Sequence, residues 1–238
     1  MFSKFISWLN GIFEKKSSLK ITVHHETKTP YEDVVPYVMG IKIALVVGHT
    51  VDHPGALNYL GESENSFNSF IATKVAHELN GQGIGCKVYR RDKNLSYSKQ
   101  VKKVSKEIKK DGASVALCLH FNSFKESAHG CEVLISKDHA FFGSDKTLFS
   151  YTLATYVVQQ LNRRMGLKKR SDDGVLSVDE NHSGGKMLSA LQSNKCAAVL
   201  VEPVFANLRT TESVAFFENK DKYINCLVNS CKMYLKNK

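Results

Sequence analysis

The sequence lacks several features that would assign a protein to a broad class at once. The 238-residue chain contains no run of about 18 apolar residues, so we expect no membrane-spanning helix. The start of the sequence has neither a continuous apolar core nor a small-residue cleavage site, and we therefore expect synthesis in the cytoplasm without a signal peptide. Internal repeats and low-complexity tracts are also absent. What remains is a globular protein long enough for one sizeable core.

Paired cysteines are absent as well. None of the six cysteines forms a C-x-x-C pair, and two of them, Cys118 and Cys196, fall inside apolar runs. We expect no disulfides, and we interpret the cysteines as small core residues of a protein made in a reducing compartment. The six are Cys86, Cys118, Cys131, Cys196, Cys226 and Cys231.

Positive charge is abundant. The chain has 33 Lys and Arg against 23 Asp and Glu, a formal net charge of +10. Such a surface can attract nucleic acid, anionic lipid or an acidic polymer. The lysines of residues 99–110, however, share a helical pattern with Val101, Val104 and Ile108, which indicates a solvated helix face. Few aromatic residues interleave with these lysines or with the basic cluster at 163–170, so we predict no nucleic-acid partner.

The first forty residues differ from the rest. Apolar residues recur at helical spacing through residues 1–18, which predicts an amphipathic segment. Three interpretations remain open: the segment packs on the main domain, lies on a membrane surface, or contacts a partner chain. A short strand at 19–25 and a proline-containing linker at 27–36 follow. We therefore divide the chain into an N-terminal segment and linker, 1–39, and a main domain, 40–238.

The main domain alternates apolar runs with helical patterns. The runs at 43–47, 115–119 and 197–201 are typical of buried strands. Further strands are predicted at 86–89 and 131–135, with helices over 67–79, 99–110, 148–161, 187–191 and 223–235. The polar stretch 171–185 is predicted to be a loop. This order predicts an α/β fold with a mixed, mostly parallel sheet flanked by helices on both faces.

Polar residues directly follow three of the apolar runs. Gly48-His49, His120 and Glu202 each follow a predicted strand directly. Sites in open α/β sheets form at the carboxyl edge of the strands, so these side chains should lie close together. Glu64, at the start of the helical pattern, can add a carboxylate. Two histidines, one carboxylate and an open fourth position form the catalytic zinc pattern of hydrolases.

Each of these residues also has a plain structural interpretation. A histidine at a strand end is often a hydrogen-bonded turn residue, and a glutamate in the first turn of a helix is often a cap. Glu202 is harder to explain in this way, because a carboxylate after five apolar residues is rare unless it is paired or functional. In the functional interpretation, Glu202 is a free carboxylate that takes a proton from water and returns it to a leaving nitrogen.

Taken together, four segments resemble one enzyme family. The chain is similar to the zinc-dependent N-acetylmuramoyl-L-alanine amidases of the amidase-3 type over about residues 41–235. This resemblance implies a phosphorylase/hydrolase-like fold. The segments are VVGH at 46–49, ENSFN at 64–68, LHFNS at 119–123 and VEPVFAN at 201–207.

The resemblance implies a role for each matching residue. His49, Glu64 and His120 would bind Zn²⁺, and Glu202 would be the catalytic base. Glu62 is a rival for the carboxylate ligand, but Glu64 places Asn68 at the family spacing. Thr50, Pro203 and Ala206 depart from the commoner family residues, which affects substrate preference more than activity. Asn122 could orient the substrate. The stretch 171–185 could line the peptide side of the cleft, with His182 as a solvated loop residue.

The implied activity is hydrolysis of the amide between N-acetylmuramic acid and L-alanine in peptidoglycan, at the cell wall. Because neither an export signal nor a wall-binding repeat is evident, a phage-type endolysin serving lysis is our hypothesis for the biological setting. The alternatives are another zinc peptidase, such as a carboxypeptidase, on a similar fold, and a non-catalytic wall-binding protein. The sequence leaves the oligomeric state open.

Overall fold

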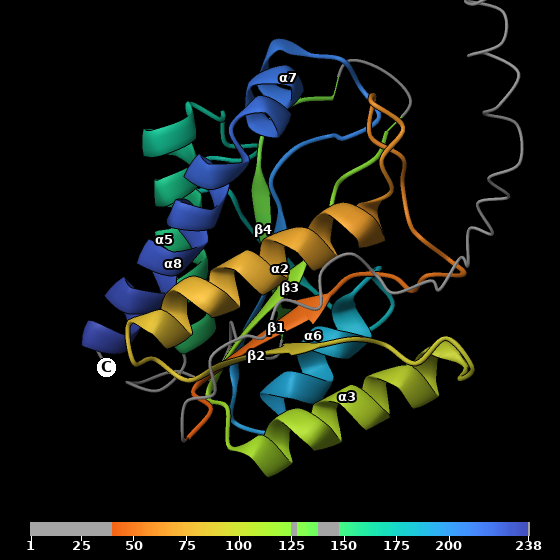
Figure 1. Cartoon of the computed structure of the whole chain (residues 1–238), viewed down its shortest axis with the longest axis vertical. Helices are drawn as coiled ribbons and strands as arrows, with labels where there is room; N and C mark the ends of the chain where they lie inside the picture. The colour runs from red at the N-terminus through yellow and green to blue at the C-terminus, as the bar shows by residue number, and fades with distance from the viewer. Residues whose placement is uncertain (1–39, 125–127, 138–147, 238) are drawn as a thin grey trace, which may run out of the picture. The chain divides into compact units, whose positions relative to one another are not determined.

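The computed structural model describes residues 40–124, 128–137 and 148–237 (Figure 1). All of them fall within one compact unit, Asp33–Lys238. The expectations for residues 1–39, namely the amphipathic segment, the short strand and the linker, lie outside the described residues. Within the described part, no helix is both long and apolar enough to cross a membrane.

A six-stranded sheet forms the centre of the domain. Its strands lie side by side in the order β2-β1-β3-β6-β4-β5. The strands are β1 (Ile43–Val47), β2 (Cys86–Tyr89), β3 (Val115–Leu119), β4 (Glu132–Ser136), β5 (Val175–Val178) and β6 (Ala197–Glu202). The first three and β6 run parallel, whereas β4 pairs antiparallel with β6 and parallel with β5. The predicted mixed, mostly parallel sheet is confirmed.

Helices cover both faces of this sheet, as the alternation of side chains along each strand requires. In β1, Ile43, Leu45 and Val47 belong to one core cluster, and Ala44 and Val46 belong to the other. The first cluster includes residues of α2, α5, α7 and α8, and the second includes residues of α3 and α6 (Figure 1). The helices are α2 (Glu64–Gly81), α3 (Tyr97–Asp111), α5 (Leu148–Met165), α6 (Gly185–Gln192), α7 (Thr211–Glu218) and α8 (Lys220–Lys236).

Local sequence explains where α2 begins and where α3 ends. The side chain of Ser63 caps α2 by accepting a hydrogen bond from Ser66 N, and Glu64 follows as the first helical residue. In α3, the lysines are exposed while Val101, Val104 and Ile108 are buried, as predicted. Gly112 ends α3 in the left-handed conformation (φ 77°), which favours glycine.

Two elements differ from the sequence expectation. The stretch 171–185 is not entirely a loop, because β5 (Val175–Val178) lies within it at the edge of the sheet. Its sequence, VLSV, is mostly apolar but short, and only its last residue is buried, so the strand depends on pairing with β4. Helix α7 was also not predicted. It begins with a capping box between Thr210 and Ser213, a serine variant of the usual pattern.

Candidate metal centre

His49 reaches the carboxyl edge of the sheet through a tight turn after β1. The left-handed conformation lies on His49 itself (φ 63°) and not on the preceding glycine. Gly48 is needed for close approach instead, because a Cβ there would lie 2.5 Å from Leu119 O and 2.8 Å from His120 Cε1. A non-glycine residue in this conformation is uncommon and is often found at functional sites.

Glu64 places its carboxylate between two imidazoles. Oε2 lies 3.2 Å from His49 Nε2, and Oε1 lies 3.0 Å from His120 Nδ1. The same two oxygens accept hydrogen bonds from the backbone N–H groups of Ala56 (3.1 Å) and Phe121 (2.9 Å). The Glu64 side chain is 2% exposed. Burial alone would raise the pKa of Glu64, but hydrogen bonds and charge from the two histidines outweigh it and lower the pKa to about 2.

His120 follows β3 and completes the cluster. Its ring centroid lies 5.2 Å from that of His49. Burial lowers the pKa of His120, which favours the neutral imidazole that binds a metal ion. One potential ligand atom from each of His49, Glu64 and His120 lies within 4.8 Å of the other two. Two imidazole nitrogens and one carboxylate oxygen form a donor set that suits a divalent transition metal.

Glu62, the alternative candidate for the carboxylate ligand, lies in different surroundings from Glu64. Glu62 Oε2 lies 3.3 Å from Lys220 Nζ and accepts a 3.5 Å hydrogen bond from Asn58 Nδ2. Glu62 therefore contacts the loop and α8, whereas Glu64 contacts both histidines.

Glu202 is the last residue of β6 and stands apart from the three clustered side chains. Its Oε2 is buried, and no hydrogen-bond partner for it is found among the described residues. Burial raises the pKa of Glu202 well above its ordinary range, and the negative charges of Glu64 and Glu132 raise it further. The charge of Arg170 acts in the opposite direction. A carboxyl in these surroundings is suited to accepting and releasing a proton.

Two residues beside Glu202 were missed at the sequence level. Glu132 faces Glu202 across the antiparallel pairing of β4 and β6. Its Oε1 accepts hydrogen bonds from Asn122 Nδ2 and Arg170 Nη1, and the Arg170 guanidinium lies 5.1 Å from the Phe205 ring. His49, His120 and Glu202 could be predicted because each follows an apolar run. Glu132 precedes its run, and only the reversed direction of β4 brings it to the site.

Two minor candidates have other surroundings. Asn122 was considered for substrate orientation, but its side-chain amide donates to Glu132. His182 is exposed, with Nδ1 2.8 Å from Ser183 O, as expected for a solvated loop residue.

Comparison with known proteins gives a consistent result. Residues 43–226 match the amidase-3 family, described as N-acetylmuramoyl-L-alanine amidase. This span begins at β1, ends within α8 and contains all the site residues described above. A search of curated protein sequences finds no match.

Several solved structures share the fold. An N-acetylmuramyl-L-alanine amidase from Mycobacterium smegmatis, Ami1, matches 85% of this chain and 100% of its own, with TM-score 0.65 and 16% identity. An N-acetylmuramoyl-L-alanine amidase from Clostridium difficile 630 matches over 84% and 99%, with TM-score 0.64 and 20% identity. The catalytic domain of an endolysin targeting Clostridia difficile matches over 80% and 96%, with TM-score 0.61 and 20% identity.

Proposed function

Since the chain belongs to the amidase-3 family of N-acetylmuramoyl-L-alanine amidases, we propose that it hydrolyses the bond between N-acetylmuramic acid and L-alanine with a zinc ion and one buried carboxylate. His49, Glu64 and His120 hold the ion, and Glu202 is the general base and acid. The observation that carries this proposal is the Glu64 carboxylate fixed between two imidazoles. Glu202 lies close enough for the Glu64 charge to act on it, and its buried Oε2 has no hydrogen-bond partner among the described residues.

The surroundings of the three ligands support a preorganised site. Two backbone N–H groups hold the Glu64 oxygens, so the carboxylate does not depend on the metal for its orientation. The side chain of Asn65 donates a 2.9 Å hydrogen bond to Gly48 O, which ties the start of α2 to the turn that carries His49. Two imidazole nitrogens with one carboxylate oxygen favour Zn²⁺ over Mg²⁺ or Ca²⁺, which prefer sites made of oxygen ligands alone.

In the proposed hydrolysis, the Glu64 carboxylate helps to hold the metal ion and the Glu202 carboxylate transfers a proton. A bound Zn²⁺ would polarise the scissile carbonyl and make water easier to deprotonate. Glu202 removes a proton from the water molecule while the water oxygen attacks the carbonyl carbon. Glu202 then delivers that proton to the amide nitrogen as the carbon–nitrogen bond breaks. The products are the lactyl carboxylic acid of the sugar and a peptide with a free amino end.

Glu132 and Arg170 affect the pKa of Glu202 and do not belong to the ligand cluster. The Arg170 guanidinium pairs with Glu132 and so limits the negative charge that faces Glu202. In this arrangement the Glu202 pKa stays above its ordinary range but does not rise as far as two unopposed carboxylates would take it. Glu132 and Arg170 are therefore positioning residues in the proposal.

We further propose that the hydrolysis serves cell-wall lysis. The net charge of +10 favours encounter with an anionic polymer, and an endolysin catalytic domain shares the fold. Purified cell walls incubated with the protein should lose turbidity and release amino ends without new reducing sugars. Release of C-terminal amino acids instead would indicate a carboxypeptidase, and binding without release would indicate a wall-binding protein.

Glu202→Gln tests the role of the general base. We expect turnover to fall by about two orders of magnitude or more, because the amide cannot accept the proton. Zinc content should be unchanged in this variant, whereas His49→Ala and His120→Ala should lose zinc together with activity. Metal analysis of all three purified variants, paired with the amino-end assay, makes the distinction. Near-normal turnover in Glu202→Gln would refute the assigned role.

A further inference from the structure

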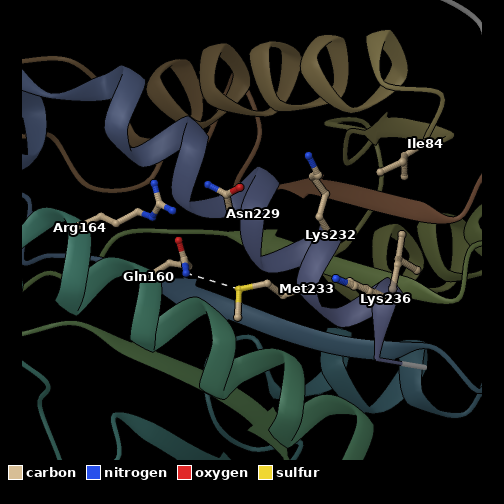
Figure 2. A pocket seen from close by; sticks show the side chains of 8 residues that line it. Ile84, Gln160, Arg164, Asn229, Lys232, Met233 and Lys236 are labelled. Atoms are coloured by element: carbon tan, nitrogen blue, oxygen red, sulfur yellow. Dashed lines mark hydrogen bonds between the residues drawn. The ribbon is translucent and has the colours of Figure 1, made fainter.

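A groove between α5 and α8 carries features that the proposed reaction does not use (Figure 2). Its volume is about 440 Å³, and its lining comes from these two helices and from Ile84, which precedes β2. None of the lining residues belongs to the candidate metal centre or to the Glu202 network. The groove is therefore a separate place on the domain.

The charge of the groove is positive and unopposed. Arg164, Lys232 and Lys236 are three of its eight lining residues, and none of the eight is acidic. Lys232 Nζ donates a 2.7 Å hydrogen bond to Gln82 Oε1, which is a neutral acceptor. Among the described residues, none of these three cations forms an ion pair. A ligand with carboxylate groups would supply the missing charge.

A residue with a buried side-chain amide lines the same groove. Gln160 is only 8% exposed, and its Nε2 makes a 3.5 Å contact with the Met233 sulfur, a weak acceptor (Figure 2). Its Oε1 is buried, and no described residue donates a hydrogen bond to it. Buried polar atoms are rarely left without a partner, so this oxygen calls for a donor. A ligand N–H in the groove would satisfy this oxygen once the Gln160 amide turns toward the opening.

The remaining wall of the groove is apolar. Ile84, Met233 and Leu235 line it beside the cations and the amide. A ligand that fits all three features carries carboxylates, N–H donors and small apolar groups. An acidic peptide has this composition.

We propose that the α5–α8 groove is a second, non-catalytic site for the acidic stem peptides of peptidoglycan. The inference rests on the proposed function, because that function makes this polymer the available ligand. Peptidoglycan repeats the same peptide many times, so the catalytic cleft and the groove can hold two peptides of one wall at once. Each site then raises the effective concentration at the other, and a weak groove contact still slows release from the wall.

The test compares two variants with the same net charge. The groove variant combines Arg164→Gln, Lys232→Gln and Lys236→Gln, and the control combines Lys102→Gln, Lys106→Gln and Lys109→Gln on the exposed face of α3. Both are made in a Glu202→Gln background so that the wall is not digested. Sedimentation with purified walls should show at least about tenfold weaker binding for the groove variant than for the control. Equal binding by the two would overturn the proposal and leave an acidic segment of a partner protein as the occupant to consider.

Gln160→Leu provides a second test that leaves the charge intact. NMR titration with N-acetyl-L-alanyl-γ-D-glutamyl-L-lysyl-D-alanine, whose two carboxylates exceed its single ammonium group, should perturb the Gln160 side-chain amide of the parent protein. Gln160→Leu should bind this peptide more weakly while its circular dichroism is retained. Unchanged peptide affinity in this variant would refute the site.

Turnover of a short soluble muramyl peptide separates the two proposals. The groove variant with Glu202 intact should cleave this substrate at the parental rate, because the groove is remote from the reacting atoms. If the parent protein binds walls through the groove but cleaves neither substrate, the proposed function fails and the groove site stands. A parallel loss of cleavage and wall binding in the groove variant would overturn the assignment of the groove as non-catalytic.

Discussion

At the scale of single residues, the buried carboxyl of Glu202 lowers the free energy of unfolding of the metal-free protein at neutral pH. Its raised pKa means that the folded protein holds this proton more tightly than the unfolded chain does. The wild-type free energy of unfolding therefore decreases as the pH rises from about 4.3, the unfolded value, toward the folded-state pKa. Strained or destabilising groups of this kind are common at active sites.

Glu202→Gln should remove this loss of stability, because the amide carries no charge to bury. We expect the variant to raise the free energy of unfolding of the metal-free protein at pH 7 by about 1 kcal/mol. The gain should vanish below a pH of about 4, where the wild-type carboxyl is protonated in both states. Urea denaturation in the presence of a chelator, at pH 4 and pH 7, measures both values. An equal gain at the two pH values would contradict the electrostatic explanation.

Gly48 is the second residue that limits the site. Gly48→Ala should lower stability by about 1–3 kcal/mol and weaken zinc binding, because the new methyl group would overlap Leu119 O and the His120 ring. Gly81→Ala is the matched control, since a Cβ at that helical position meets nothing within 4 Å. Thermal unfolding and zinc titration compare the two variants. Normal zinc affinity in Gly48→Ala would show that the added methyl group is accommodated without displacing His120.

At the scale of helices and strands, local patterns predicted most of the fold. The runs that became β1, β3 and β6 are fully apolar, and the amphipathic pattern of α3 is clear from sequence alone. These elements also deliver His49, His120 and Glu202, which explains why the candidate site could be predicted. The edge strand β5 is mostly exposed and depends on a distant partner, and sequence alone does not reveal such pairing.

The direction of β4 is the other feature that the sequence does not encode locally. An apolar run has the same pattern whichever way the strand points in the sheet. Because β4 is antiparallel to β6, its first residue, not its last, lies beside the site. Glu132 and its partner Arg170 could therefore be recognised only after the strands had been placed.

This pairing yields a prediction for Arg170. Arg170→Gln should lower turnover about tenfold or more and shift the acidic limb of the pH–activity profile to higher pH, because the cation that opposes the rise in the Glu202 pKa is removed. Zinc content should remain normal. Arg163→Gln, an exposed change in α5, removes the same charge as a control. A profile that keeps its acidic limb while activity falls would assign Arg170 to another role.

At the scale of the whole molecule, the excess of 10 positive charges should make the enzyme sensitive to salt. Raising the ionic strength from about 0.05 M to 0.5 M should reduce the rate on intact walls severalfold, because screening weakens long-range attraction to the polymer. The rate on a short, neutral muramyl dipeptide amide should change little. Initial rates on both substrates across the salt series provide the measurement. An equal loss on both would point to an effect of salt on the fold instead.

The candidate site occupies one edge of the sheet, and this leaves the opposite edge open to engineering. The turns that carry the ligands and Glu202 all gather at one edge. The short connections at 112–114 and 193–196 precede β3 and β6 at the other edge. Ala113 and Cys196 in these connections are buried and hydrogen-bonded through their backbone, whereas Gly112 and Ser193 are exposed. A reporter peptide or affinity tag attached at Gly112 or Ser193 would therefore emerge away from the reacting groups.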